Sequence, residues 1–208
     1  ELQQRLTQRD GLLGMRQQLR NQLHALEHEA IVVATVRQRF EALIATVERE
    51  LDALDAELAT ALCDDAAWAA AAERLQSIPG IGHVTAAWLL VATLNFTICA
   101  TPQAAVAYAG LAPSPRQSGT RVRGPERMSR LGHARLRTAL YMASLSAAQH
   151  NPAIKPFYAR LRATGKPTKV ARCAAARKLL HIAWAVTTKG QPFDPHYHER
   201  REGQDTGA

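Results

Sequence analysis

A serine next to a glycine, set among arginines, is the feature of this sequence that most directly suggests chemistry. Ser118 precedes Gly119, which leaves its hydroxyl unshielded, and residues 116–137 contain seven arginines and one glutamate. A hydroxyl in this setting can attack a phosphodiester, because guanidinium groups stabilise the charge that develops on phosphate and favour the alkoxide. Serines are also common in turns, so composition alone does not distinguish whether Ser118 is a nucleophile or an ordinary loop residue.

Arginine, rather than lysine, dominates around this serine. Its planar guanidinium group contacts phosphate oxygens in a bidentate manner. A second basic segment, residues 155–178, contains eight lysines and arginines and no acidic residue, which is typical of a track for a DNA or RNA backbone. The residues that we expect to bind nucleic acid in these two segments are Arg116, Arg121, Arg123, Arg127, Arg130, Arg135, Arg137, Lys166 and Lys169.

A glycine-containing turn between two helical segments offers another contact with phosphate. Residues 75–90 contain the run Ile78-Pro79-Gly80-Ile81-Gly82. Gly80 and Gly82 permit backbone conformations that other residues avoid, and their amides can point at a phosphate oxygen together with the helix that follows. The pattern resembles the helix-hairpin-helix motif of DNA-binding proteins that do not read sequence, with Ile78 and Ile81 as core anchors. The same turn can also serve packing or protein contact alone.

The charge is unevenly distributed along the chain. The net charge is +8, but residues 1–75 hold 8 basic against 13 acidic residues (−5), whereas residues 76–208 hold 18 against 5 (+13). Such a field suits a polyanion, and we prefer this interpretation to a merely solvated basic surface.

Other residues could take part in chemistry, but each also has an ordinary structural explanation. His83 and His133 can contact phosphate or move a proton, yet lone histidines usually lie on the surface. Tyr108 and Tyr141 are alternative nucleophiles within apolar helical runs, where packing is the simpler role. Trp88 and Trp184 are expected in the core. His196 and His198 have metal-like spacing but no third ligand, so we expect no metal there.

The composition predicts an all-α fold. Apolar residues make up 47% of the chain, aromatic residues only 5%, and alanine is abundant. Residues 1–28 and 31–62 are expected to form two helices, the second with a heptad-like stripe from Val36 to Ala61. They predict an antiparallel coiled-coil arm that dimerises or spaces domains, although an ordinary pair of bundle helices fits equally well.

A second helical unit follows the arm, with Thr101-Pro102 as a helix start and Gly110, Gly165 and Gly190 as helix ends. Residues 111–129, rich in proline and glycine, are expected to form the longest loop. The predicted organisation is therefore an arm over 1–63, a helix-hairpin-helix-containing domain over 64–190 and a loose tail over 191–208.

Three scattered cysteines without a Cys-x-x-Cys pair argue against disulfides or structural zinc and fit a reducing cytoplasm. No run of eighteen apolar residues exists, so no membrane partner is expected. The sequence starts at Glu1 rather than Met, and we expect it to be a fragment of a longer protein.

An ordered series of motifs over residues 75–190 resembles the C-terminal half of a transposase of the insertion-sequence one-ten family, relatives of the inversion recombinase Piv. The segments that carry the resemblance are Ser77–Gly82, Ala107–Pro113, Ser118-Gly119, Arg127–Arg137, Leu140–Ala143, Asn151-Pro152, Phe157–Leu161, Gly165-Lys166 and Ala174–Leu180. The preceding helical arm is similar to the coiled-coil spacer of that family.

This resemblance implies a function. The family uses a serine nucleophile, which falls on Ser118, together with an N-terminal RuvC-like domain whose four acidic residues bind magnesium, and a structured guide RNA. We find no acidic cluster of that kind here. The resemblance therefore implies DNA recombination, with homo-oligomerisation through the arm, no cofactor held by these residues, and Mg²⁺ in the full-length protein. A non-catalytic helix-hairpin-helix module for repair or junction processing, and a coiled-coil adaptor that binds acidic proteins, remain the alternatives.

Overall fold

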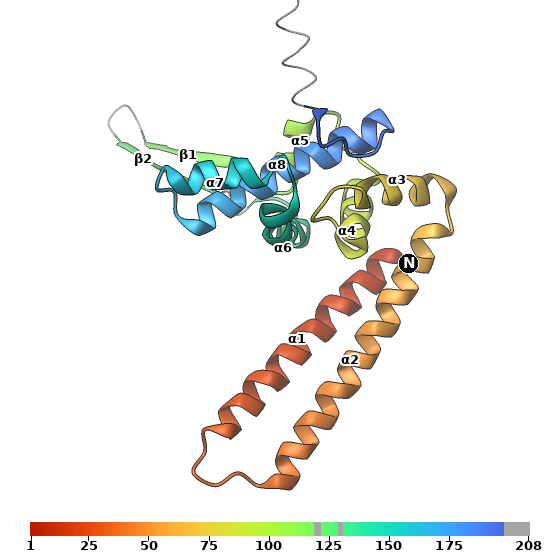
Figure 1. Cartoon of the computed structure of the whole chain (residues 1–208), viewed down its shortest axis with the longest axis vertical. Coiled ribbons are helices and arrows are strands. Elements are labelled where there is room, and N and C mark those ends of the chain that lie inside the picture. The colour runs from red at the N-terminus through yellow and green to blue at the C-terminus, as the bar shows by residue number, and fades with distance from the viewer. Residues whose placement is uncertain (119–121, 129–130, 198–208) are drawn as a thin grey trace, which may run out of the picture. The chain divides into compact units, whose positions relative to one another are not determined.

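The computed structural model describes residues 1–118, 122–128 and 131–197, with the backbone alone over 114–118 and 122–127. Over these ranges the chain forms eight α-helices and one two-stranded antiparallel sheet (Figure 1). The all-α class is confirmed. The chain divides into two compact units, Glu1–Asp65 and a second unit that begins at Ala66.

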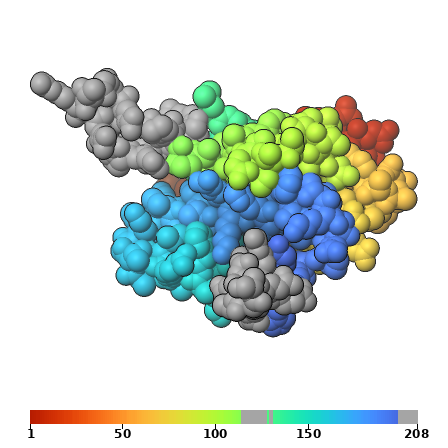
Figure 2. Space-filling view, turned by 90° about the horizontal axis from the view of Figure 1, so that it is seen from above, coloured from red at the N-terminus to blue at the C-terminus, as the bar shows by residue number. Residues whose placement is uncertain are grey.

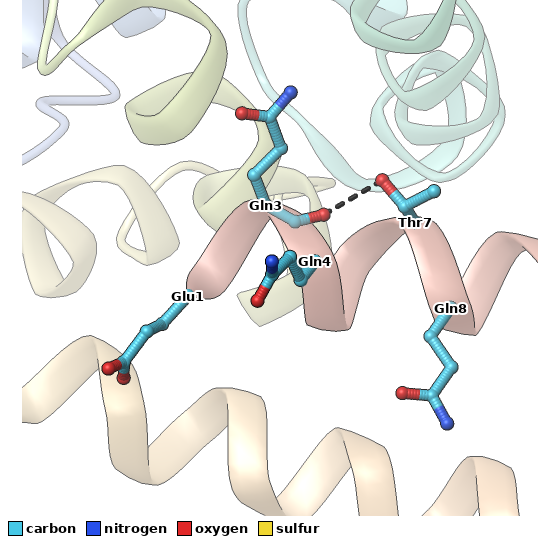
Figure 3. Close-up of a pocket in the computed structure, with 5 residues that line it drawn as sticks. All are labelled: Glu1, Gln3, Gln4, Thr7 and Gln8. Atoms are coloured by element: carbon cyan, nitrogen blue, oxygen red, sulfur yellow. Dashed lines mark hydrogen bonds between the residues drawn. The ribbon is translucent and has the colours of Figure 1, made fainter.

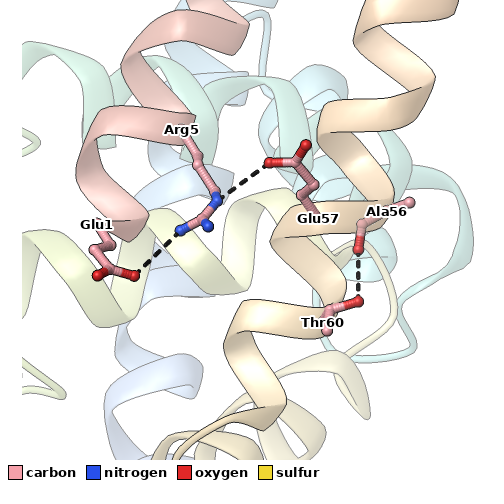
Figure 4. Close-up of polar contacts among 5 residues, drawn as sticks. All are labelled: Glu1, Arg5, Ala56, Glu57 and Thr60. Carbon is pink, nitrogen blue, oxygen red and sulfur yellow. Dashed lines mark hydrogen bonds and ion pairs between the residues drawn. The ribbon is translucent and has the colours of Figure 1, made fainter.

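The first unit is a pair of long antiparallel helices, α1 (Leu2–Glu27) and α2 (Ala34–Cys63), which pack along each other (Figure 1). Ion pairs between them fix their alignment, because partners that advance along α1 move back along α2. Their closest N···O distances are 3.3 Å for Arg5–Glu57, 2.5 Å for Arg9–Asp55, 2.5 Å for Arg20–Glu48 and 3.5 Å for Arg37–Glu27. Figure 4 shows Arg5 held by both Glu57 and Glu1.

The apolar stripe of α2 is covered over only part of its length. Leu51, Leu54 and Leu58 are buried, whereas Val36 and Leu43 nearer the turn are 36% and 52% exposed. In the single chain, the apolar stripe of α2 is therefore buried toward the end of the helix and exposed near the turn.

The second unit is built around an alanine-rich helix. Its helices are α3 (Ala66–Gln76), α4 (His83–Thr93), α5 (Pro102–Tyr108), α6 (Ala134–His150), α7 (Lys155–Ala163) and α8 (Thr168–Lys189). Helix α8 contacts α3, α5, α6 and α7. Its buried face includes Ala171, Ala175, Ala176 and Ala183, together with Leu179. Small side chains at this face let several helices approach the same axis while the leucines fill the space between them.

Local signals at helix ends act as the sequence predicts. The Thr101 hydroxyl accepts a hydrogen bond from the Ala104 amide at 3.1 Å, and Pro102 follows at the first helical position. Gly190 ends α8 in the left-handed region, with φ +67°.

The proline- and glycine-rich segment differs from its prediction. Instead of a loop it forms a β-hairpin of β1 (Pro113–Ser118) and β2 (Val122–Met128), with an irregularity in register between Ser114 and Arg116. Proline lacks the N–H that a central strand needs, so the sequence argues against a sheet. In a two-stranded ribbon both strands are edges, and Pro115 falls at the irregularity, so the prolines are tolerated.

The start of the C-terminal tail is also more ordered than expected. The Phe193 amide donates to the Ser77 hydroxyl at 2.8 Å, and Lys189 Nζ lies 3.2 Å from the Tyr197 hydroxyl. Residues 191–197 therefore contact the second unit through these two hydrogen bonds. No helix in the described part of the chain is both long and apolar enough to cross a membrane.

Candidate nucleic-acid interface

Two glycines close the base of the β-hairpin. Gly110 and Gly132 both have positive φ, +68° and +106°, and a Cβ on Gly132 would lie 2.6 Å from the Gly110 amide nitrogen. The His133 amide donates to the Tyr108 carbonyl at 2.7 Å across the same point. Only residues without a side chain allow this approach, so the end of α5 and the start of α6 are clamped together at the base of the hairpin.

Ser118 lies at the far end of this hairpin from the clamp. It is the last residue of β1 and pairs with Val122. Six residues lie between Leu111 and Ser118, and an extended strand rises about 3.3 Å per residue, so Ser118 stands roughly 20 Å from the base of the hairpin. Figure 1 shows β1 and β2 side by side as a two-stranded ribbon.

The hairpin register separates the arginines that the sequence grouped together. In β1 and β2, Arg116 pairs with Gly124, Gln117 with Arg123, and Ser114 with Arg127. Arg135 and Arg137, in contrast, belong to α6 and lie beyond the base of the hairpin. Arg135 and Arg137 therefore lie on a helix and not on the hairpin that carries Ser118. Arg121 and Arg130 lie outside the described residues.

The two glycines of the turn between α3 and α4 differ in backbone conformation and in surroundings. Gly80 has φ +104°, and a Cβ there would lie 2.7 Å from Ala147 Cβ and 2.8 Å from the Ala147 nitrogen of α6. Gly82 caps α4 with φ −90°, an ordinary value, and has nothing within 4 Å of its Cβ position. The prediction of a special conformation is therefore confirmed for Gly80 and wrong for Gly82. Gly80 packs against α6, while Gly82 remains open at the start of α4.

A buried amide attaches the same turn to the end of α6. Asn151 is fully buried, and its Nδ2 donates to the Pro79 carbonyl at 3.0 Å, while its Oδ1 accepts from the Ala153 and Ile154 amides. Ile78 and Ile81 are buried, as expected for anchors of the turn. Long-range packing therefore holds the turn in place.

The second basic segment presents its cations on α7, α8 and the turn between them. Lys166 and Lys169 are exposed. In the part of the chain that the structure describes, the lysines and arginines of α7 and α8 form no ion pair, whereas α1 and α2 are rich in them. Positive charge on these two helices is therefore available to an anionic partner.

The structure gives structural roles to most of the other candidates. His133 caps α6, with its Nδ1 accepting from the Leu136 amide at 3.1 Å, and its ring lies between 5.8 and 6.0 Å from those of Tyr108 and Trp88. Trp88 is buried, and Trp184 Nε1 donates to the Cys99 carbonyl at 2.8 Å. These contacts give His133, Trp88 and Trp184 structural roles that require no part in catalysis.

Over the described ranges, no three His, Cys, Asp or Glu side chains gather as a metal site would require. Figure 3 shows the cavity along α1, lined by Glu1, Gln3, Gln4, Thr7 and Gln8, in which Thr7 Oγ1 donates to the Gln3 carbonyl at 2.8 Å. Glutamine and threonine side chains on one exposed helix face form neither a metal site nor a catalytic one.

Aromatic residues among the cations were missed by the sequence analysis. Phe157 lies against Lys178, whose Nζ is 4.9 Å from the ring centroid, and against Arg160 at 5.6 Å. Burial, aided by the charge of Arg160, lowers the pKa of Lys178. Hydrogen bonding to Tyr141 raises the pKa of Arg172. The signal was present, because Phe157 and Tyr158 stand inside the acid-free segment 155–178.

These features describe a basic helical domain with an arginine-bearing hairpin, and comparison with known proteins shows what it is similar to. Residues 72–159 match the model of the family described as Transposase IS116/IS110/IS902 family. The match includes the clamp, the hairpin and Ser118.

Among individual proteins, the chain is 37% identical over 129 residues to the pilin gene-inverting protein of Moraxella bovis, covering 62% of this chain and 40% of that protein. It is 35% identical over 120 residues to the IS110 uncharacterized 43.6 kDa protein of Streptomyces coelicolor, covering 58% and 29%. An IS900 uncharacterized 42 kDa protein of Mycobacterium paratuberculosis is 34% identical over 125 residues, covering 60% and 31%. The matched stretch thus spans two fifths or less of these relatives.

Proposed function

We propose that this chain is the part of a DNA recombinase that attacks the DNA strand, with Ser118 as the nucleophile. The observation that carries the proposal is the position of Ser118: it ends β1 on a hairpin that bears arginines, inside the segment that matches the transposase family. A projecting hairpin can bring a hydroxyl to a phosphate that is held on the helical body or on another molecule.

In the proposed step, the Ser118 oxygen forms a bond to the phosphorus of a DNA phosphodiester while the bond from phosphorus to one deoxyribose oxygen breaks. The serine proton leaves to water or to a neighbouring base, and the departing oxygen takes up a proton. The phosphoserine linkage conserves the energy of the original bond, so rejoining needs no nucleotide triphosphate. Arginines stabilise the charge on the phosphate oxygens.

The proposal assigns phosphate binding to the hairpin arginines, to Lys166 and Lys169, and to the open amide end of α4 at Gly82. The described residues hold no group of three His, Cys, Asp or Glu side chains that could bind a metal. We expect Mg²⁺ and its acidic ligands to come from a RuvC-like domain outside these residues, and a structured guide RNA to direct the DNA site. We further propose that the exposed apolar part of α2 mediates homo-oligomerisation in the cytoplasm.

The test is a covalent-adduct assay on the protein that joins this chain to the RuvC-like domain, with guide RNA, Mg²⁺ and end-labelled DNA. The parent should form an adduct that survives denaturation, and peptide mass spectrometry should place it on Ser118. Ser118→Ala should abolish the adduct and still bind DNA. Ser114→Ala and Ser129→Ala are matched controls on the same segment and should retain it.

Two outcomes would refute the assignment. An adduct that persists in Ser118→Ala, or that maps to Tyr108 or Tyr141, would show that Ser118 is not the nucleophile. DNA binding without an adduct in any preparation would favour the non-catalytic DNA-binding module instead.

A further inference from the structure

Three helices carry aromatic rings beside cations in a part of the second unit that the proposed strand attack does not use. The contacts form two groups, Phe157 with Arg160 and Lys178, and Tyr141 and Tyr158 with Arg172. We call the six residues together the aromatic–cationic face; Tyr141 belongs to α6, Phe157, Tyr158 and Arg160 to α7, and Arg172 and Lys178 to α8. Helices α6, α7 and α8 contact one another. In Figure 2 the cyan-to-blue atoms of α7 and α8 form a continuous surface.

Several members of this face hold one another in place. Lys178 Nζ donates to the Ala153 carbonyl at 3.1 Å and lies 4.9 Å from the Phe157 centroid, and Arg160 lies 5.6 Å from the same ring. Tyr141 and Tyr158 interact with Arg172. A ligand that binds here therefore meets side chains that are already ordered, which reduces the entropy lost on binding.

The face is accessible, and its charge is of one sign. Arg160 is exposed, and the other five members are half-buried. The surrounding segment 155–178 has no acidic residue, and its described cations form no ion pair. Such a surface complements a chain of phosphates.

The three rings narrow the choice of polyanion. In a duplex the base faces are stacked on each other. Its phosphates can therefore contact the cations of the protein, but its bases cannot stack on the aromatic side chains. In an unpaired strand the base faces are free, and stacking on aromatic side chains adds to phosphate contact without regard to sequence. An acidic peptide would neutralise the cations but carries no series of flat rings.

We propose that the aromatic–cationic face binds an unpaired polynucleotide strand, with Arg160, Arg172 and Lys178 contacting phosphates and Tyr141, Phe157 and Tyr158 contacting bases. This inference deepens the proposed nucleic-acid function by naming the kind of strand and the residues that hold it. It does not depend on Ser118 as nucleophile.

The test measures fluorescence anisotropy of labelled oligonucleotides with the whole 208-residue chain. The probes are single-stranded DNA, single-stranded RNA of the same sequence, and the matching DNA duplex. The parent should bind at least one single strand more tightly than the duplex. Tyr158→Leu should weaken single-strand binding about fivefold or more while changing duplex binding by less than about twofold, since stacking is lost. Tyr158→Phe keeps the ring but loses the hydroxyl that contacts Arg172, so it should retain most of the single-strand binding that Tyr158→Leu loses.

A charge-matched comparison separates this face from general basicity. Arg172→Gln and Arg162→Gln each remove one cation, and Arg162 is exposed on α7 but outside the face. Arg172→Gln should weaken single-strand binding more. Circular dichroism tests whether each variant is folded. If Tyr158→Leu does not fold, Phe157→Leu replaces it as the variant that lacks a ring.

Tighter binding of the duplex than of both single strands would overturn the inference, and so would equal losses of affinity for Arg172→Gln and Arg162→Gln. Ring variants that bind single strands as tightly as the parent would also overturn it. The same holds if polyglutamate competes as effectively as an oligonucleotide. A preference for RNA or for DNA identifies the source of the strand, and equal binding also supports the inference. Failure of the Ser118 adduct with these results intact would refute only the proposed strand attack.

Discussion

Replacing Gly80 with alanine should destabilise the second unit strongly, whereas the same change at Gly82 should cost little. At Gly80 the new Cβ would lie 2.7, 2.8 and 2.9 Å from the Cβ, nitrogen and Cα of Ala147, and φ is +104°. A left-handed conformation costs an L-residue about 1–2 kcal/mol, and overpacking adds about 1–3 kcal/mol, so we expect a loss of about 2–5 kcal/mol. Gly82 has φ −90° and open space, so we expect about 1 kcal/mol or less from the poorer cap.

Urea unfolding followed by tryptophan fluorescence measures this difference directly. The three tryptophans of the chain, Trp68, Trp88 and Trp184, all lie in the second unit, so the signal does not report on the helical pair. The unfolding midpoint should fall sharply for Gly80→Ala and stay close to the parent for Gly82→Ala.

Adding Ala147→Gly to Gly80→Ala should recover only part of the loss, because two of the three close atoms belong to the backbone of α6. Equal midpoints for Gly80→Ala and the parent, or equal losses at the two glycines, would refute the packing argument. If Gly82→Val then weakens DNA binding without loss of stability, the open end of α4 is the part of the turn that meets phosphate.

Three further changes test the residues that position the turn and the hairpin. Asn151→Ala removes the hydrogen bond to the Pro79 carbonyl and leaves buried groups unpaired, so the same urea assay should show a loss of about 2–4 kcal/mol. His133→Ala removes the cap on α6 and should cost about 1 kcal/mol, which His133→Ser should largely restore. Burial, aided by Arg177, lowers the pKa of His181 from its ordinary 6.5. The unfolded chain therefore binds this proton first, and stability should fall as pH drops below 6.5, less steeply in His181→Leu.

The helices were predictable because their signals are local. Thr101-Pro102 and Gly190 mark helix boundaries through contacts within a few residues. The periodic apolar residues of α2 also gave its extent to within about three residues, since its helix runs over Ala34–Cys63.

The predictions that were wrong concern features that depend on contacts between residues distant in the sequence. Nothing near Gly80 indicates that Ala147 will lie against it, so the sequence could not tell a packing glycine from one that approaches a ligand. The hairpin was hidden for the opposite reason, since Pro113, Pro115 and Pro125 argue against strands in general but not in a ribbon with two edges.

The clamp at Gly110 and Gly132 links these findings to the proposed chemistry. It joins α5 to α6 at one end of the hairpin, and Ser118 stands at the other, roughly 20 Å away. Over that length, a rotation of about 10° at the base would move the far end by roughly 3 Å, and displacements near 1 Å already slow reactions that require an aligned nucleophile. Under the proposed mechanism, residues far from the reacting atoms, whose own contacts are backbone packing, therefore control where Ser118 can react.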